Sequence, residues 1–99
     1  IKIEDPTADL AVATAVASAF KAEEVIPDTV ILGEVGLAGE IRSISQPGLR
    51  INEAEKLGFK YAIIPKNNYK SFKDYKGGIK IIPVSTLKEG LEAGLGGKR

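Results

Sequence analysis

Apolar side chains near the start of this chain recur with the spacing of a helix. Residues 8–20 are small and apolar on nearly every side, which predicts a helix buried on most of its faces. Asp5 before Pro6 is a start signal, because the carboxylate can accept from unpaired amides and proline needs no amide partner in the first turn. The polar positions at helical spacing are Thr7, Thr14 and Ser18.

Later in the chain the apolar positions form short runs that predict strands, at residues 30–32, 41–44, 61–64 and 79–82. Glycines between the first two runs predict that these strands form a hairpin, since glycine adopts positive φ at little cost. A helix over residues 47–57 should end at Gly58. A last helix should begin at Thr86, whose spacing to Glu89 is that of a capping box. The turn glycines are Gly33, Gly36 and Gly39.

Helices interleaved with strands predict an α/β fold, a two-layer mixed sheet with packed helices. The 99 residues, 43% of them hydrophobic, suffice for one core, so residues 1–99 are interpreted as a single domain. The chain opens at Ile1 inside an apparent strand over residues 1–3. We therefore interpret it as a fragment of a larger protein.

Composition excludes several classes of chemistry. The chain has no cysteine and no histidine, which excludes disulfides, thiolate or imidazole metal sites, and Ser-His or Cys-His catalysis by this chain alone. It contains neither a run of about 18 apolar residues nor a basic-then-apolar leader. We therefore expect a cytoplasmic location and no membrane partner.

Charge is sorted along the chain, although the net charge is only +1. Residues 1–40 carry two lysines against eight acids, whereas residues 60–80 carry six lysines against Asp74. Aromatics interleave with these lysines, a composition typical of a sequence-neutral nucleic-acid contact. The alternative is a solvated loop whose aromatics pack inward. The lysines are Lys60, Lys66, Lys70, Lys73, Lys76 and Lys80, and the aromatics are Phe59, Tyr61, Tyr69, Phe72 and Tyr75.

Two segments resemble the reactive site of Lon-type ATP-dependent proteases. Residues 4–9, Glu-Asp-Pro-Thr-Ala-Asp, resemble the Asp-Gly-Pro-Ser-Ala-Gly stretch that carries the nucleophilic serine. Residues 33–42 resemble the Gly-Glu-(Ile/Val)-x-Leu-x-Gly-x-(Val/Ile) hairpin of the same enzymes. With residues 1–12, 50–59 and 63–67, they resemble in order the C-terminal Lon-protease-like domain of the bacterial RadA (Sms) family of DNA-repair proteins. The resemblance implies the Lon proteolytic-domain fold (ribosomal-protein domain-2-like), without its N-terminal strands.

The resemblance puts Thr7 at the place of the catalytic serine and Arg50 at the place of the catalytic lysine. A guanidinium stays protonated near pH 7, so Arg50 cannot act as the base. Asp5 and Asp9 replace glycines and should restrict the backbone near an oxyanion site. Thr7 has a second interpretation, in which it satisfies first-turn amides. Arg50 either pairs with Glu53 on the helix surface or contacts a phosphate or a neighbouring subunit.

The resemblance further implies a non-catalytic domain of a DNA repair and recombination ATPase, which contributes to DNA binding and ring assembly. The implied partners are single-stranded or branched DNA and further copies in a hexamer. No cofactor is expected in this domain, while ATP, Mg and structural Zn are implied for the parent protein. An active Lon-type peptidase using Thr7, and a purely structural oligomerisation module, are the alternatives. The DNA contacts predicted from charge are Arg42, Arg50, Lys60, Lys66, Lys70, Lys73 and Lys76.

Overall fold

The computed structural model describes residues 5–96, so the strand predicted over residues 1–3 lies outside them. The elements, with η for 3-10 helices, are η1 (Pro6–Ala8), α1 (Asp9–Lys21), β1 (Thr29–Ile31), β2 (Glu34–Val35), β3 (Ile41–Arg42), α2 (Pro47–Lys56), β4 (Tyr61–Pro65), η2 (Lys66–Phe72), β5 (Lys80–Val84) and α3 (Leu87–Gly94). Strands β1, β4 and β5 form a parallel sheet in that order, and β2 pairs with β3 in a separate antiparallel ribbon.

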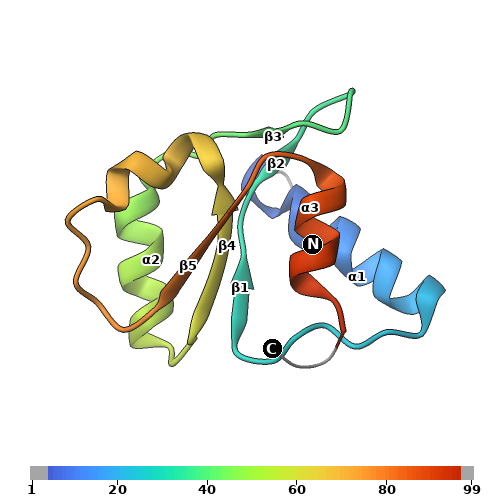
Figure 1. Ribbon diagram of the computed structural model, residues 1–99, viewed down its shortest axis with the longest axis horizontal. Coiled ribbons are helices and arrows are strands. Elements are labelled where there is room, and N and C mark those ends of the chain that lie inside the picture. Colours follow the sequence, from blue (N-terminus) through green and yellow to red (C-terminus); the bar gives the residue numbers. More distant parts are fainter. Residues whose placement is uncertain (1–4, 97–99) are drawn as a thin grey trace.

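Helices cover both faces of the parallel sheet (Figure 1), with α2 on one face and α1 and α3 on the other. The alternation of side chains along β4 explains this arrangement: Ala62 and Ile64 face the α2 side, while Ile63 packs toward Leu10 of α1. The predicted α/β fold is confirmed, with three layers where two were expected. Two layers would have left one side of β4 exposed, and all three of these residues are fully buried.

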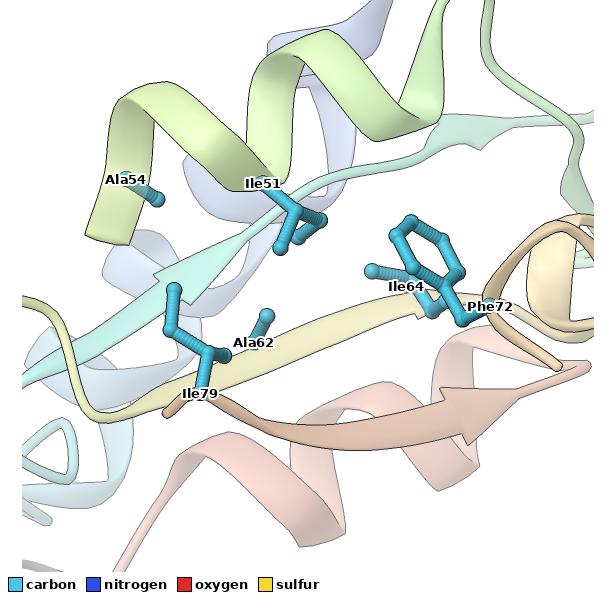
Figure 2. Close-up of a cluster of buried hydrophobic side chains, with 6 residues drawn as sticks. All are labelled: Ile51, Ala54, Ala62, Ile64, Phe72 and Ile79. Atoms are coloured by element: carbon cyan, nitrogen blue, oxygen red, sulfur yellow. The ribbon is translucent and has the colours of Figure 1, made fainter. Parts of the chain in front are cut away.

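The core on the α2 face anchors the chain on both sides of the lysine-rich segment. Figure 2 shows Phe72 reaching in from η2 and Ile79 from just before β5, so that both meet Ile51 of α2. Removing a buried phenylalanine side chain destabilises a domain by about 3–5 kcal/mol. The residues between Phe72 and Ile79 are therefore fixed at both ends by the core.

Helix α1 is oriented differently from the prediction that it is buried on most sides. Two residues of the predicted polar ridge, Thr7 and Thr14, are buried, and the Thr14 hydroxyl donates to the Leu10 carbonyl at 2.7 Å and so needs no water. Gly94 of α3 packs close by, since a Cβ there would lie 3.3 Å from Thr14 Cγ2. The small buried side chains let α1 and α3 approach closely, while the apolar ridge stays exposed. The exposed apolar residues are Val12, Val16 and Phe20.

The predicted hairpin exists, but with different strands. Residues 30–32 do not pair with residues 41–44; β1 pairs with β4 instead, and the hairpin joins β2 to β3 with Glu34 opposite Arg42. Gly33 separates β1 from β2 and packs tightly, because a Cβ there would lie 2.9 Å from Ile41 Cγ2. Positive φ explains only Gly39 among the three turn glycines, with φ 83°.

Candidate functional site

The structure brings Thr7 and Arg50 to one carboxylate. The Thr7 amide donates to Asp5 Oδ1 at 2.9 Å, and Arg50 Nη1 lies 3.7 Å from Asp5 Oδ2. Asp5 caps η1, the turn that leads into α1, while Arg50 projects from α2. The two positions matched to the Lon dyad are thus joined through a third residue, which itself stands where the resemblance placed a glycine.

Hydrogen bonds from Thr7 hold Asp5 in its ionised form. The Thr7 backbone amide and then its hydroxyl lower the pKa of Asp5 below its usual range, and the nearby Arg50 lowers it further. A carboxylate with a lowered pKa is a weak base near neutral pH. The first-turn amide is therefore satisfied by the Asp5 carboxylate, and the side chain of Thr7 is buried beside that cap.

The Arg50 guanidinium is held within the molecule on two sides. Its Nε donates to the Ser45 carbonyl at 2.8 Å, its Nη2 lies 3.5 Å from Ser45 Oγ, and Nη1 faces Asp5. The predicted pair with Glu53 is wrong, because Glu53 instead pairs with Lys56 at 3.7 Å. With its side chain 30% exposed, Arg50 is a restrained cation rather than a free one.

An apolar groove of about 410 Å³ opens beside Arg50, between α2 and the sheet. Its walls come from two separate segments of the chain, residues 30–32 and 46–59, which is why sequence reasoning did not find it. The polar groups along it come from Gln46, Arg50 and Glu53. The apolar lining residues are Val30, Leu32, Leu49, Ala54, Leu57 and Phe59.

The two aspartates that replace glycines adopt ordinary backbone conformations. Asp5 has φ −81° and Asp9 has φ −52°, so neither occupies the positive-φ region. Asp9 Oδ2 accepts from the Val35 amide at 3.2 Å, and the Gly33 amide donates to the Thr7 carbonyl at 2.9 Å. These bonds fix the start of α1 against the hairpin.

The lysines of η2 and the loop after it have a different environment. Lys66, Lys70, Lys73 and Lys76 are all exposed, and none forms an ion pair with any residue of the described range 5–96. Lys70 and Lys73 share one side of the turn, since a 3-10 helix has three residues per turn. The segment predicted as a loop therefore contains the short helical turn expected for these lysines.

Two polar residues that sequence reasoning missed fix this segment. Asn68 is buried and pairs with both backbone groups of Ile44: its Oδ1 accepts from the amide at 2.8 Å and its Nδ2 donates to the carbonyl at 3.1 Å. Glu55 accepts from the Tyr75 hydroxyl at 2.8 Å and from the Gly78 amide at 3.1 Å. The only sequence signal for either was a polar residue between two apolar runs.

These bonds also shift two pKa values. The Gly78 amide, and next the Tyr75 hydroxyl, lower the pKa of Glu55. Burial raises the pKa of Tyr75, and its bond to the Glu55 carboxylate raises it further. At neutral pH, Glu55 is thus an ionised acceptor and Tyr75 a neutral donor.

The remaining predicted contacts, Arg42 and Lys60, are paired. Arg42 lies 3.5 Å from Glu34 and 3.3 Å from Glu40, which makes it the central charge of the hairpin. Lys60 Nζ lies 4.0 Å from Asp28. Of the seven cations predicted to contact DNA, three are therefore matched with acids and four are not, counting partners within residues 5–96.

A second hollow, also of about 410 Å³, brings Arg42 and Lys66 to one surface between β3 and η2. Its other polar groups include the Glu40 carboxylate and the Asn67 amide. Within residues 5–96, no three acidic side chains are grouped so as to hold a metal ion. In the same range, no helix is long and apolar enough to cross a bilayer.

Nearly the whole chain matches a known family of domains. Residues 1–97 match the model of the Lon protease (S16) C-terminal proteolytic domain. The chain belongs to this family. The predicted Lon-type fold is thus confirmed.

The relatives of this Lon-type domain include DNA repair proteins named RadA. The chain is 48% identical to RadA of Aquifex aeolicus over 92 residues, which are 93% of this chain and 20% of that protein. It is 41% identical over 96 residues to RadA of Halalkalibacterium halodurans, covering 97% of this chain and 21% of the relative. The corresponding identity with RadA of Synechocystis sp. is 45% over 87 residues, 88% of this chain and 17% of the relative. The chain thus spans about a fifth of the length of these relatives.

Proposed function

We propose that this Lon-type domain is a non-catalytic, DNA-binding part of a DNA-repair ATPase, and that the lysines of η2 contact DNA phosphates. The observation that carries the proposal is the set of exposed lysines without ion pairs among residues 5–96. Its relatives are DNA repair proteins, which supports DNA as the polyanion. The lysines are Lys66, Lys70, Lys73 and Lys76.

The absence of peptidase activity is proposed from the surroundings of Thr7 and Arg50. A threonine hydroxyl needs an adjacent base before it can attack a carbonyl. Arg50 offers no lone pair, and Asp5, the acid that contacts Thr7 within residues 5–96, has a lowered pKa. Both groups stabilise the junction between η1 and α2, which explains why a site of this shape persists without its reaction.

An unpaired lysine can neutralise a DNA phosphate without first breaking an ion pair within the protein. Neutralising the phosphate releases the counterion that was condensed on the DNA. The logarithm of the binding constant falls linearly with the logarithm of the salt concentration. Each phosphate neutralised adds about 0.7 to the magnitude of that slope for single strands and about 0.9 for duplex DNA. Contact by Lys66, Lys70 and Lys73 therefore predicts a slope of roughly 2–3. Such a surface has no means of reading sequence, since lysine contacts to phosphate do not distinguish bases.

The wider assembly is proposed from the similarity of the chain to RadA proteins. We expect the parent protein to form a ring of copies, a hexamer in the cytoplasm, and to hold ATP, Mg and structural Zn outside this domain. Gly33, Gly36 and Gly39 lie in and beside a hairpin rather than at the start of a helix, so they do not form a phosphate-binding loop. We therefore propose that ATP binds in other parts of the parent protein.

The test is a triple charge reversal of Lys66, Lys70 and Lys73 to Glu in the full chain, measured by fluorescence anisotropy with labelled DNA at several salt concentrations. We expect affinity at low salt to fall by roughly 100-fold and the salt slope to fall by about 2–3. The mechanism is the loss of phosphate neutralisation together with new repulsion. Circular dichroism should show an unchanged fold, because all three side chains are exposed.

The matched control reverses three exposed lysines on other elements, Lys21, Lys56 and Lys88, and so changes the net charge by the same amount. Affinity should then change by less than about threefold, because these lysines belong to α1, α2 and α3 rather than to η2. Equal losses of DNA affinity in the two variants would show that net charge alone explains the effect. They would contradict the assignment of DNA contact to the η2 lysines. Absence of DNA binding by the unaltered chain would overturn the proposal itself and favour the oligomerisation module.

A further inference from the structure

One aromatic side chain in the lysine-rich segment is not used by the core. Phe72 is buried and packs edge-on against Tyr75, with ring centroids 5.8 Å apart, while Phe59 and Tyr61 are half-buried. Tyr69, in contrast, is 49% exposed and has no hydrogen bond to any residue in the range 5–96. Folding thus divides the five aromatics of the segment into four that stabilise the domain and one that faces solvent.

Tyr69 lies among the unpaired cations. Lys66 precedes it by one turn of the 3-10 helix and so shares its side, Lys70 is its neighbour, and Lys73 follows one turn after Lys70. None of these lysines is matched by an acid within the described part of the chain. Proteins bind single strands with exposed aromatic rings close to unpaired cations in the chain, the ring stacking on a base and the cations following the backbone.

The backbone on both sides of Tyr69 is held in place. Asn68, the residue before it, is fixed by two hydrogen bonds to Ile44, and Phe72 is inserted in the core shown in Figure 2. A ring presented on a fixed backbone loses little conformational freedom when it stacks. Tyr69 is therefore organised for contact before any ligand arrives.

We infer that Tyr69 stacks on an unpaired base and gives the η2 surface a preference for single-stranded over duplex nucleic acid. The inference rests on the proposed function, since it assigns the strand form that the same lysines bind. A duplex offers its phosphates to Lys66, Lys70 and Lys73, but its base faces are already stacked on one another. Only an unpaired strand presents a free base face to Tyr69.

The chain contains no tryptophan, so Tyr69→Trp introduces a single fluorophore at the position in question. Titration with a short oligothymidylate should quench this fluorescence, because a stacked base contacts the indole directly, whereas a blunt duplex hairpin should leave it nearly unchanged. Phe20→Trp is the matched control, because Phe20 is 88% exposed and belongs to α1, which lies across the sheet from α2 and is not part of the η2 surface (Figure 1). Its fluorescence should respond to neither nucleic acid.

Affinity measurements separate stacking from charge. Tyr69→Ala should lower the affinity for oligothymidylate by roughly 5- to 100-fold, as expected for one lost stacked base, and leave duplex affinity within about twofold. Tyr69→Phe keeps the ring and should retain single-strand binding. If Tyr69→Ala leaves the ratio of the two affinities unchanged while the lysine reversals still abolish binding, the stacking inference is wrong and the DNA-binding surface stands. If the unaltered chain binds neither strand form, the proposed function fails and the inference fails with it.

Discussion

Arg50 and Lys70 carry the same charge, and both were predicted to contact DNA, yet their surroundings differ. Arg50 lies between Asp5 and Ser45 with its guanidinium bound on two sides, whereas Lys70 extends from η2 with no acid paired to it among residues 5–96. A phosphate that approaches Arg50 must compete with an existing carboxylate. The comparison teaches that a count of cations overestimates the charge available to a ligand.

The distribution of acids along the chain explains the difference. Most acids lie in residues 1–40, and folding brings four of them against cations that follow in the chain. These acids are Asp5, Asp28, Glu34 and Glu40. Helix η2 and the loop after it lie at the outer edge of the molecule near α2 (Figure 1), and Lys66 at the start of η2 borders the hollow that also contains Glu40. The nearby Glu55 accepts from Tyr75 and pairs with no lysine. Among residues 5–96, the excess of lysines over acids seen in the sequence is therefore kept in the folded chain at η2.

The largest predicted effect comes from removing the Asn68 side chain, which holds the lysine-bearing η2 in place. Asn68→Ala leaves the buried amide and carbonyl of Ile44 without their partners, which should lower the free energy of unfolding by about 2–4 kcal/mol. Chemical denaturation measures this loss. DNA affinity should fall as well, although no charge is removed, because η2 no longer holds Lys66, Lys70 and Lys73 in one arrangement.

The neighbouring Asn67 supplies the control, since it is exposed and its side chain makes no hydrogen bond within residues 5–96. Asn67→Ala should change the stability by less than about 0.5 kcal/mol. If the two variants had equal stability, Asn68 would not be the anchor. The η2 lysines would then depend on Phe72 alone for their position.

A second prediction tests the two cations directly. Lys70→Gln should weaken DNA binding by roughly three- to fivefold and reduce the salt slope by about 0.7–0.9, because it removes one phosphate contact. Arg50→Gln should change affinity by less than about twofold, since its charge is already matched by Asp5. Anisotropy titrations at several salt concentrations measure both. A larger effect at Arg50 would mean that the Asp5 pair opens on binding, and it would reverse the ranking of the two regions.

Local features of the fold were predictable from the sequence because short-range chemistry determines them. Gly58 ends α2 with φ 91°, and Thr86 with Glu89 forms the predicted capping box. The orientation of α1 was not predictable. Thr14 satisfies its hydroxyl on its own helix, so a polar residue became as suitable for burial as the valines on the opposite ridge.

The candidate site likewise has some features that the sequence predicts and others that it does not. That Arg50 cannot serve as a base follows from its side chain alone. Its partner Asp5 was not predictable, because the two residues are distant in sequence and only the packing of η1 against α2 brings them together. The interleaving of lysine and aromatic residues indicated a nucleic-acid surface, but burial decided that Tyr69 alone of its five aromatics is exposed.

The smallest predicted effect concerns the loop that follows η2, where pH should act through Glu55. Its pKa is lower in the folded chain than the ordinary value of 4.5, mainly because the Gly78 amide donates to it. A lowered folded pKa means that the stabilisation is complete above about pH 4.5 and is lost as pH falls through the folded pKa. Protonation removes the charge that holds Gly78 and Tyr75, so the loop should open in acid before the core does.

Amide exchange detected by NMR tests this at Gly78 and at Ile79, whose amide donates to the Tyr75 hydroxyl at 3.2 Å. Their exchange, corrected for the intrinsic pH dependence, should accelerate below about pH 4.5, while the Ile63 amide in the central strand stays protected. Glu55→Gln should make the loop equally open at every pH, because an amide keeps an acceptor but not the charge. A wild-type loop whose protection does not change with pH would show that Phe72 and Ile79 fix it without Glu55. The lysine-bearing region would then owe its arrangement to apolar packing, whereas the Arg50 region owes its own to ionic contacts.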